Sequence, residues 1–173
     1  MFVCGVHSGK SVEIGLQHRY GVSGAAFLGD KVVFAASTRE KYGSSENPVF
    51  FLADPRTGEV TELADLAPSM YSSVGSDCRY GGGRSHKATE SGWYYTETRG
   101  FNSYIVRLDR ACKEKVVSPQ IDGSVDCFDY FEGNFLYVGM RENGLQELYT
   151  CREGEGKEEK LTEFNEEYLN THK

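Results

Sequence analysis

Residues 73–109 read SVGSDCRYGGGRSHKATESGWYYTETRGFNSYIVRLD, and this stretch decides the fold. A glycine-rich connector leads into three strand-like runs, Arg84–Ala88, Trp93–Thr98 and Tyr104–Leu108, which are separated by short segments rich in Gly, Ser and Asn. Such segments favour tight turns between strands. A charged run, Lys113–Val117, supplies a fourth strand. The stretch therefore predicts a four-stranded antiparallel unit.

Similar units lie on both sides of this one, and together they form a repeat. The three copies cover residues 21–63, 84–117 and 124–162, and the first-turn glycines Gly92 and Gly133 lie 41 residues apart. A period of about 40–50 residues with four strands per unit is typical of a β-propeller. We therefore expect an all-β chain built from propeller blades.

The composition of the strands supports blades over other β folds. The middle strands are apolar on consecutive residues, as in Val32–Ala36, so both of their faces need cover. Blades stacked face to face provide that cover, whereas the strands of a β-sandwich alternate between apolar and polar residues. The fourth strands are charged, as outer edge strands usually are. The sandwich is the weaker alternative.

The number of units predicts a partial propeller. Residues 1–16 form a leading half-blade before the three full blades, and closed propellers have about 4–8 blades. We expect residues 1–162 to be a segment of a longer propeller or one half of a paired assembly, in which two copies would total seven blades. Residues 163–173 are expected to be a tail or linker.

Composition excludes several classes of function. The net charge of −7 argues against nucleic-acid binding, and no apolar run is long enough to span a membrane. The N-terminus lacks the basic lead and apolar core of a signal peptide. Five dispersed cysteines fit free thiols in a reducing compartment, so a cytoplasmic location is expected. Their spacing predicts no metal site, and no motif predicts a cofactor.

Three patterns resemble catalytic or phosphate-binding motifs, but each is better explained as structure. Ser8–Ser11 lacks the earlier glycine of a phosphate-binding loop, since Cys4 occupies that position. Gly21–Ala25 approaches a serine nucleophile elbow but leads into a turn and not into a helix. The four histidines are isolated in sequence, so no proton-transfer pair is predicted. We expect no catalytic residue in this chain.

Asp77, Arg79 and Arg84 are the candidate site residues, on either side of Gly81–Gly83. Asp77 suits a turn in which its side chain accepts backbone N–H groups, and glycines permit close approach of the backbone. The favoured interpretation is a rigid connector between blades near the propeller axis. The alternative is that these three residues line a pore or a mouth that faces substrate.

Two stretches resemble a known family. Ser73–Gly83, together with the ending Glu147–Tyr149 and Lys160–Leu169, is similar to the propeller of the prolyl oligopeptidase family of serine peptidases, in its acylaminoacyl-peptidase-like and dipeptidyl-peptidase-like branch. In that family an L-T-x-x-N-x-x-x-L pattern ends the last propeller strand before an α/β-hydrolase domain. The resemblance covers residues 21–169 and does not include that catalytic domain, so no catalytic residue is carried over.

The resemblance implies a non-catalytic propeller segment that gates or supports the access of peptides to a separate α/β-hydrolase domain. Its expected partners are that hydrolase domain and the peptide substrates of the parent enzyme, and self-association through open blade faces is also expected. The alternative is a freestanding interaction propeller of the kelch or WD kind, although their glycine pair and Trp-Asp dipeptide do not recur here. A secreted glycosidase or lectin propeller is disfavoured by the absence of a signal peptide.

Overall fold

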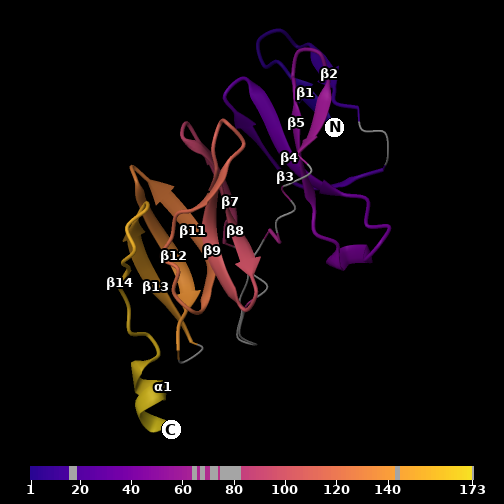
Figure 1. Cartoon of the computed structure of the whole chain (residues 1–173). Helices are drawn as coiled ribbons and strands as arrows, with labels where there is room; N and C mark the ends of the chain where they lie inside the picture. Colours follow the sequence, from indigo (N-terminus) through magenta and orange to yellow (C-terminus); the bar gives the residue numbers. More distant parts are fainter. Residues whose placement is uncertain are drawn as a thin grey trace. The chain divides into compact units, whose positions relative to one another are not determined.

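The computed structural model describes residues 1–15, 19–63, 66, 69–70, 74, 83–142 and 145–172. The chain divides into two units, Met1–Ser69 and Met70–Lys173. The prediction of an all-β fold is confirmed, because among the described residues only the 3₁₀ turn η1 (Gly43–Ser45) and the helix α1 (Glu166–Thr171) are helical (Figure 1). No helix within the described ranges is long and apolar enough to cross a membrane.

The first unit holds one complete blade and one hairpin. The blade, called here the first blade, is a meander in which each strand pairs antiparallel with the next. Its strands are β3 (Gly21–Leu28), β4 (Lys31–Ser37), β5 (Val49–Ala53) and β6 (Val60–Leu63). The hairpin, called the half-blade, pairs β1 (Phe2–Cys4) with β2 (Ser11–Glu13).

Burial of β4 on both faces follows from its sequence. Six of its seven residues are buried, as expected for consecutive apolar side chains. Val32 and Phe34 share a core with Ile14 at the end of the half-blade, and Val3 packs against the same core. The half-blade therefore covers one face of the first blade.

The second unit holds two more meanders. The second blade consists of β7 (His86–Thr89), β8 (Gly92–Arg99), β9 (Asn102–Leu108) and β10 (Glu114–Val116). The third blade consists of β11 (Ser124–Phe131), β12 (Asn134–Met140), β13 (Gln146–Arg152) and β14 (Glu159–Lys160). With the first blade and the half-blade, these sheets make the predicted partial β-propeller.

The second and third blades pack face to face through an aromatic core. Tyr94 of β8 stacks on Tyr130 of β11, with ring centroids 4.6 Å apart, and meets the edge of Phe135 at 5.5 Å. Ile105 of β9 and Tyr137 of β12 are buried in the same core. Large aromatic side chains dominate the energy of such interfaces because each buries a large apolar area.

The glycines that marked the repeat lie in the turn between the first two strands of a blade or, for Gly92, at the start of the second strand. Gly29 and Gly133 have φ values of 67° and 85°, in the left-handed region that glycine enters without strain. Gly92 has a φ of 153°, and a Cβ there would overlap the carbonyl oxygen of Leu108. Each blade therefore has a glycine in or directly after the turn between its first and second strands, where the backbone conformation or a close contact disfavours a side chain.

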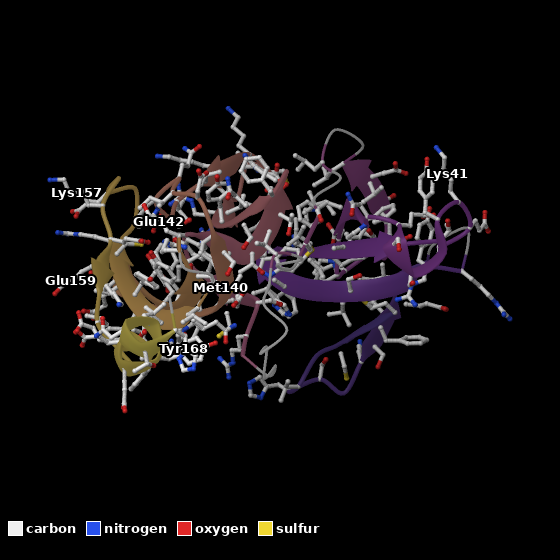
Figure 2. All side chains as sticks on the ribbon, turned by 90° about the horizontal axis from the view of Figure 1, so that it is seen from below. Lys41, Met140, Glu142, Lys157, Glu159 and Tyr168 are labelled. Carbon is white, nitrogen blue, oxygen red and sulfur yellow. The ribbon has the colours of Figure 1, made fainter. Side chains whose placement is uncertain are left out.

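The outer margin of the third blade is charged. Lys157 and Glu159 project outward there, and α1 lies beyond the end of β14 (Figures 1 and 2). Charged side chains on an edge strand discourage pairing with another chain. The division of the chain into a propeller segment, residues 1–162, and a tail, residues 163–173, stays a prediction.

Candidate functional site

Of the three predicted site residues, Arg84 is exposed just before β7, whereas Asp77 and Arg79 lie outside the described residues. The backbone of the segment that carries Arg84 is bonded to two blades. The carbonyl oxygen of Arg84 accepts the N–H of Phe128 on β11 at 3.0 Å, and that of Ser85 accepts the N–H of Thr96 on β8 at 2.8 Å. This segment therefore ties the second blade to the third.

Gly83 explains part of the glycine triplet. A Cβ on Gly83 would overlap the side chain of Cys127, so only glycine lets the segment approach β11 this closely. Gly81 and Gly82 lie outside the described residues. The close approach matches the role of a connector between blades.

Arg84 also lines a hollow of about 380 Å³ on the face of the third blade that points away from the second blade. The floor is apolar and includes Leu136, Val138 and Leu148, and the rim includes Arg84 and Asp129. Lys87 donates a hydrogen bond to the Asp129 carboxylate and forms an ion pair with it. That bond, with smaller contributions from the Tyr130 N–H and from the charges of Lys87 and Arg84, lowers the pKa of Asp129.

The Asp129 carboxylate and the Arg84 guanidinium give this hollow a charged rim. Its carboxylate is already engaged by a lysine and its pKa is lowered, so it is a poor general base at neutral pH. Arg84 offers a cation beside an apolar floor. Leu136 on that floor is the third residue of β12, as Tyr94 is the third residue of β8, where it packs against the following blade. The hollow therefore lies where another blade would pack.

A partly buried polar cluster, called here the latch, joins the second and third blades. Its centre is Glu153, after β13, which accepts hydrogen bonds from the hydroxyls of Tyr94 at 2.8 Å and Tyr130 at 3.0 Å. Arg107 of β9 forms an ion pair with the same carboxylate. Burial is the main reason why the pKa of Tyr94 is raised, so this hydroxyl stays a donor.

Sequence reasoning missed the latch. Glu153 begins a charged stretch, residues 153–159, of the kind that usually forms a solvated turn, and its partner Tyr94 is 59 residues away. Nothing local marks a glutamate as the acceptor of two tyrosine hydroxyls. Only the packing of two blades brings these groups together.

A second cluster, called here the exit clamp, fixes the chain where it leaves the third blade. Glu147 of β13 is buried, and its carboxylate accepts the hydroxyl of Thr162 at 2.5 Å and the backbone N–H groups of Phe164 at 3.1 Å and Asn165 at 3.0 Å. The Asn165 side chain donates to the carbonyl oxygen of Gln146 at 2.7 Å. The N–H of Leu148 also donates to the Thr162 hydroxyl, at 2.9 Å.

The exit clamp gives the L-T-x-x-N pattern a physical meaning. Its threonine and asparagine, Thr162 and Asn165, both bind Glu147. Burial raises the pKa of the Glu147 carboxyl, but the hydrogen bonds from Thr162 and Asn165 outweigh that effect, and the pKa lies below its ordinary value. The clamp is therefore charged, and fully hydrogen-bonded in this way, at neutral pH. The pattern was visible in the sequence, but its glutamate partner was not.

The motifs that resembled catalytic sites have structural roles. Ser8, Gly9 and Lys10 form the turn between β1 and β2, where the Ser8 hydroxyl accepts the N–H of Lys10 at 3.3 Å. Ser23 lies inside β3, which pairs directly with β4, and no helix follows it as a nucleophile elbow would require. Within the described ranges, no three His, Cys, Asp or Glu side chains gather as metal ligands would.

Comparisons with known proteins support the fold. No family model and no curated protein matches the sequence. Among solved structures, the chain is similar to an acylaminoacyl peptidase from Pyrococcus horikoshii, with a TM-score of 0.61 and 17% identity over 96% of this chain. It is also similar to the β-propeller domain of the trilobed protease from Pyrococcus furiosus, with a TM-score of 0.54 and 19% identity over 91% of this chain. An acylaminoacyl peptidase in complex with Z-Gly-Gly-Phe-chloromethyl ketone gives a TM-score of 0.59 and 17% identity over 94% of this chain.

These matches cover only part of each solved chain. This protein spans 23% of the first, 44% of the second and 22% of the third. The likeness shows the propeller fold. The resemblance to the propellers of this peptidase group, noted in the sequence, is thereby confirmed at the level of the fold.

Proposed function

We propose that this chain is a non-catalytic propeller segment of a serine peptidase, and that it gates or supports the access of peptides to a separate α/β-hydrolase domain. The observation that carries the proposal is the similarity of nearly the whole chain to peptidase structures, one of which is a β-propeller domain. The exit clamp and the exposed Arg84 add to this similarity.

The exit clamp suits a chain that continues into another domain. It fixes residues 162–165 to β13 immediately before α1, so the direction in which the chain leaves the third blade is set by side-chain bonds. A hydrolase domain attached there would have a defined starting direction. This is the role that the family pattern predicts for the end of the last propeller strand.

Arg84, with Asp77 and Arg79 near it in sequence, would then contribute to the wall that peptides pass. Arg84 is exposed beside the hollow, where its guanidinium would be accessible to a peptide carboxylate. The partners in this proposal are the hydrolase domain and the peptides that it cleaves. Open blade faces also make self-association of the isolated chain part of the proposal.

The test asks which protein carries this segment in the cell. An antibody raised against the chain is used on extracts of cells that express the gene, and the recovered protein is treated with a fluorophosphonate probe that labels active serine hydrolases. We expect a probe-labelled protein several times heavier than the 19.3 kDa of this chain. Recovery only of an unlabelled 19.3 kDa species would contradict the proposal and favour the freestanding interaction propeller.

The purified chain gives a second test. It should not hydrolyse chromogenic acylaminoacyl or dipeptidyl substrates, because no catalytic triad is predicted in it. If the pure protein turned over these substrates and a serine-directed inhibitor abolished that turnover, the proposed non-catalytic role would be contradicted.

A further inference from the structure

The turn of the half-blade repeats the turn between the third and fourth strands of the first blade. At the turn after β5, the N–H of Asp54 donates to the carbonyl oxygen of Glu59, and the N–H of Gly58 donates to that of Asp54. At the turn after β1, Gly5 makes the same two bonds with Lys10 and Gly9. Gly9 and Gly58 both have left-handed φ values, 65° and 79°. By this comparison β1 and β2 are the third and fourth strands of a blade.

One edge of β1 has no strand beside it, although third strands pair on both sides. β5 pairs with β4 and β6, whereas β1 pairs only with β2 among the described strands. The N–H of Ile14 donates to the carbonyl oxygen of Met1, and the N–H of Gly5 donates to that of Lys10. Since bonded positions alternate in an antiparallel pair, the backbone groups of Phe2 and Cys4 point to the open edge.

The open edge borders an apolar groove of about 240 Å³, whose floor includes Ala25, Phe27 and Val32 of the first blade. Phe27 is 61% exposed, and Phe2 beside the groove is 67% exposed. Large apolar side chains grouped in this way mark an interaction site more often than a solvated surface.

The third blade shows what covers these positions in a complete stack. Phe27 pairs with the second residue of β4, and Tyr130 pairs with the second residue of β12, so the two positions are equivalent. Tyr130 lies under the ring of Tyr94, which comes from the second strand of the neighbouring blade. Phe27 is open because the half-blade has no second strand among the described residues. All fourteen described strands already belong to one of the four sheets, so none of them is left to fill the groove.

We propose that the open edge of β1 and the groove beside it bind an antiparallel β-hairpin that supplies the two inner strands of this blade. The second strand of the hairpin pairs with β1 through Phe2 and Cys4. It places an aromatic or large aliphatic side chain over Phe27, as Tyr94 does over Tyr130. Main-chain bonds give this mode of binding its affinity, and the side-chain pocket gives it selectivity. The inference goes beyond the proposed function and holds whether or not the parent protein is a peptidase.

A copy of part of this chain can serve as the test hairpin, because its register with β1 can be set by comparison with β9. Met1 lies four residues before the turn residue Gly5, as Ile105 lies four residues before the turn residue Asp109. A copy of residues 86–104 is therefore grafted directly before Met1, so that copied β7 and β8 reach β1 as they reach β9. Direct attachment gives a local concentration of the order of mM. Amide hydrogen exchange is measured by NMR in the parent chain and in the grafted chain.

We expect the amides of Phe2 and Cys4 to exchange at least about tenfold more slowly in the grafted chain, because they become bonded within a ladder. The matched control carries Trp93→Pro and Tyr95→Pro in the grafted copy alone. Proline cannot donate to the ladder, so protection should be lost. A Phe27→Ala change in the grafted chain should reduce the protection, since it removes the side chain that the hairpin covers.

Three results would overturn the proposal. The first is unchanged exchange at Phe2 and Cys4 in the grafted chain, and the second is a graft that unfolds the first unit. The third is protection of these amides in the ungrafted parent that disappears on dilution together with a dimer seen by light scattering. That last result would assign the edge to a second copy of the chain.

Discussion

Tyr94 and Leu136 occupy equivalent positions of the second and third blades but have opposite surroundings. Each is the third residue of the second strand in its blade. Tyr94 is fully buried in the core between the two blades, whereas Leu136 is 46% exposed on the far face of the third blade. The repeat therefore makes both positions apolar, and the presence of a neighbouring blade decides whether the side chain is buried.

The comparison separates the contribution of a single blade to stability from the contribution of stacking between blades. Pairing of the four strands is similar in the second and third blades, but the aromatic core and the latch exist only where two blades meet. Substitutions on the covered face should therefore cost far more than substitutions on the open face of the same strand.

The largest contrast is expected between two neighbouring residues of β12. Phe135 is fully buried against Tyr94, so Phe135→Ala should lower the free energy of unfolding by about 3–5 kcal/mol. Leu136→Ala, on the open face, should change it by no more than about 0.5 kcal/mol. Urea denaturation followed by tyrosine and tryptophan fluorescence measures both. Equal losses would show that the open face is covered in solution.

The next largest effect is expected at the latch. Glu153→Gln removes the charge that holds Arg107 and two tyrosine hydroxyls, and it should cost about 1–3 kcal/mol. Glu155→Gln, in the same turn, is the matched control, because its ion pair with Arg152 is exposed and should contribute no more than about 0.5 kcal/mol. The same denaturation experiment compares the two variants. Indistinguishable midpoints would mean that stacking of the blades does not depend on the latch.

A local effect is expected at the exit clamp. Glu147→Gln replaces the acceptor of four hydrogen bonds, so residues 162–165 should detach more often from β13. Amide exchange at Leu148 and Asn165 should accelerate by about tenfold or more, while the core of the blades keeps its protection. Glu163→Gln is the control, since Glu163 is exposed. Equal exchange in both variants would show that the clamp does not anchor the C-terminal segment.

The smallest effect is expected in the pKa of Glu46, in the loop between β4 and β5 of the first blade. Glu46 accepts hydrogen bonds from the Ser37 hydroxyl and from the backbone of Lys41 and Tyr42, and these lower its pKa from 4.5 to about 2. A lowered folded-state pKa stabilises the loop above pH 4.5, and this stabilisation is lost as the pH falls toward 2. Ser37→Ala should raise the pKa of Glu46, as a carboxyl NMR titration would show. A pKa unchanged by this substitution would rule out the Ser37 bond as its main cause.

The repeat itself could be predicted from sequence because its signals are local. Turn glycines such as Gly133 have a conformational requirement that no other residue meets easily, and runs such as Val32–Ala36 reveal strands covered on both faces. Irregularities within strands could not be predicted. The first strands β3 and β11 each carry an irregularity, between Val22 and Gly24 and between Val125 and Cys127, that no local pattern marked.

The candidate sites could be predicted only in part, because they depend on contacts between distant segments. Arg84 was singled out, and it lies at the rim of the hollow on the third blade. Glu147 and Glu153 were not singled out, since a glutamate in a charged stretch looks like a solvated residue until its partners are known. Residues 1–16 were predicted to form a half-blade, but its equivalence to a third and fourth strand is shown by the hydrogen bonds of the turn at Gly5.

The exit clamp also determines how mechanical tension would enter the molecule. β14 pairs with β13 at only two positions, Tyr149 with Lys160 and Thr150 with Glu159, and such a short ladder separates easily when it is peeled from its end. Tension applied to the C-terminal helix first meets the bonds of Thr162 and Asn165 to Glu147. The load therefore passes to the interior strand β13, and the weak outer strand is shielded from it.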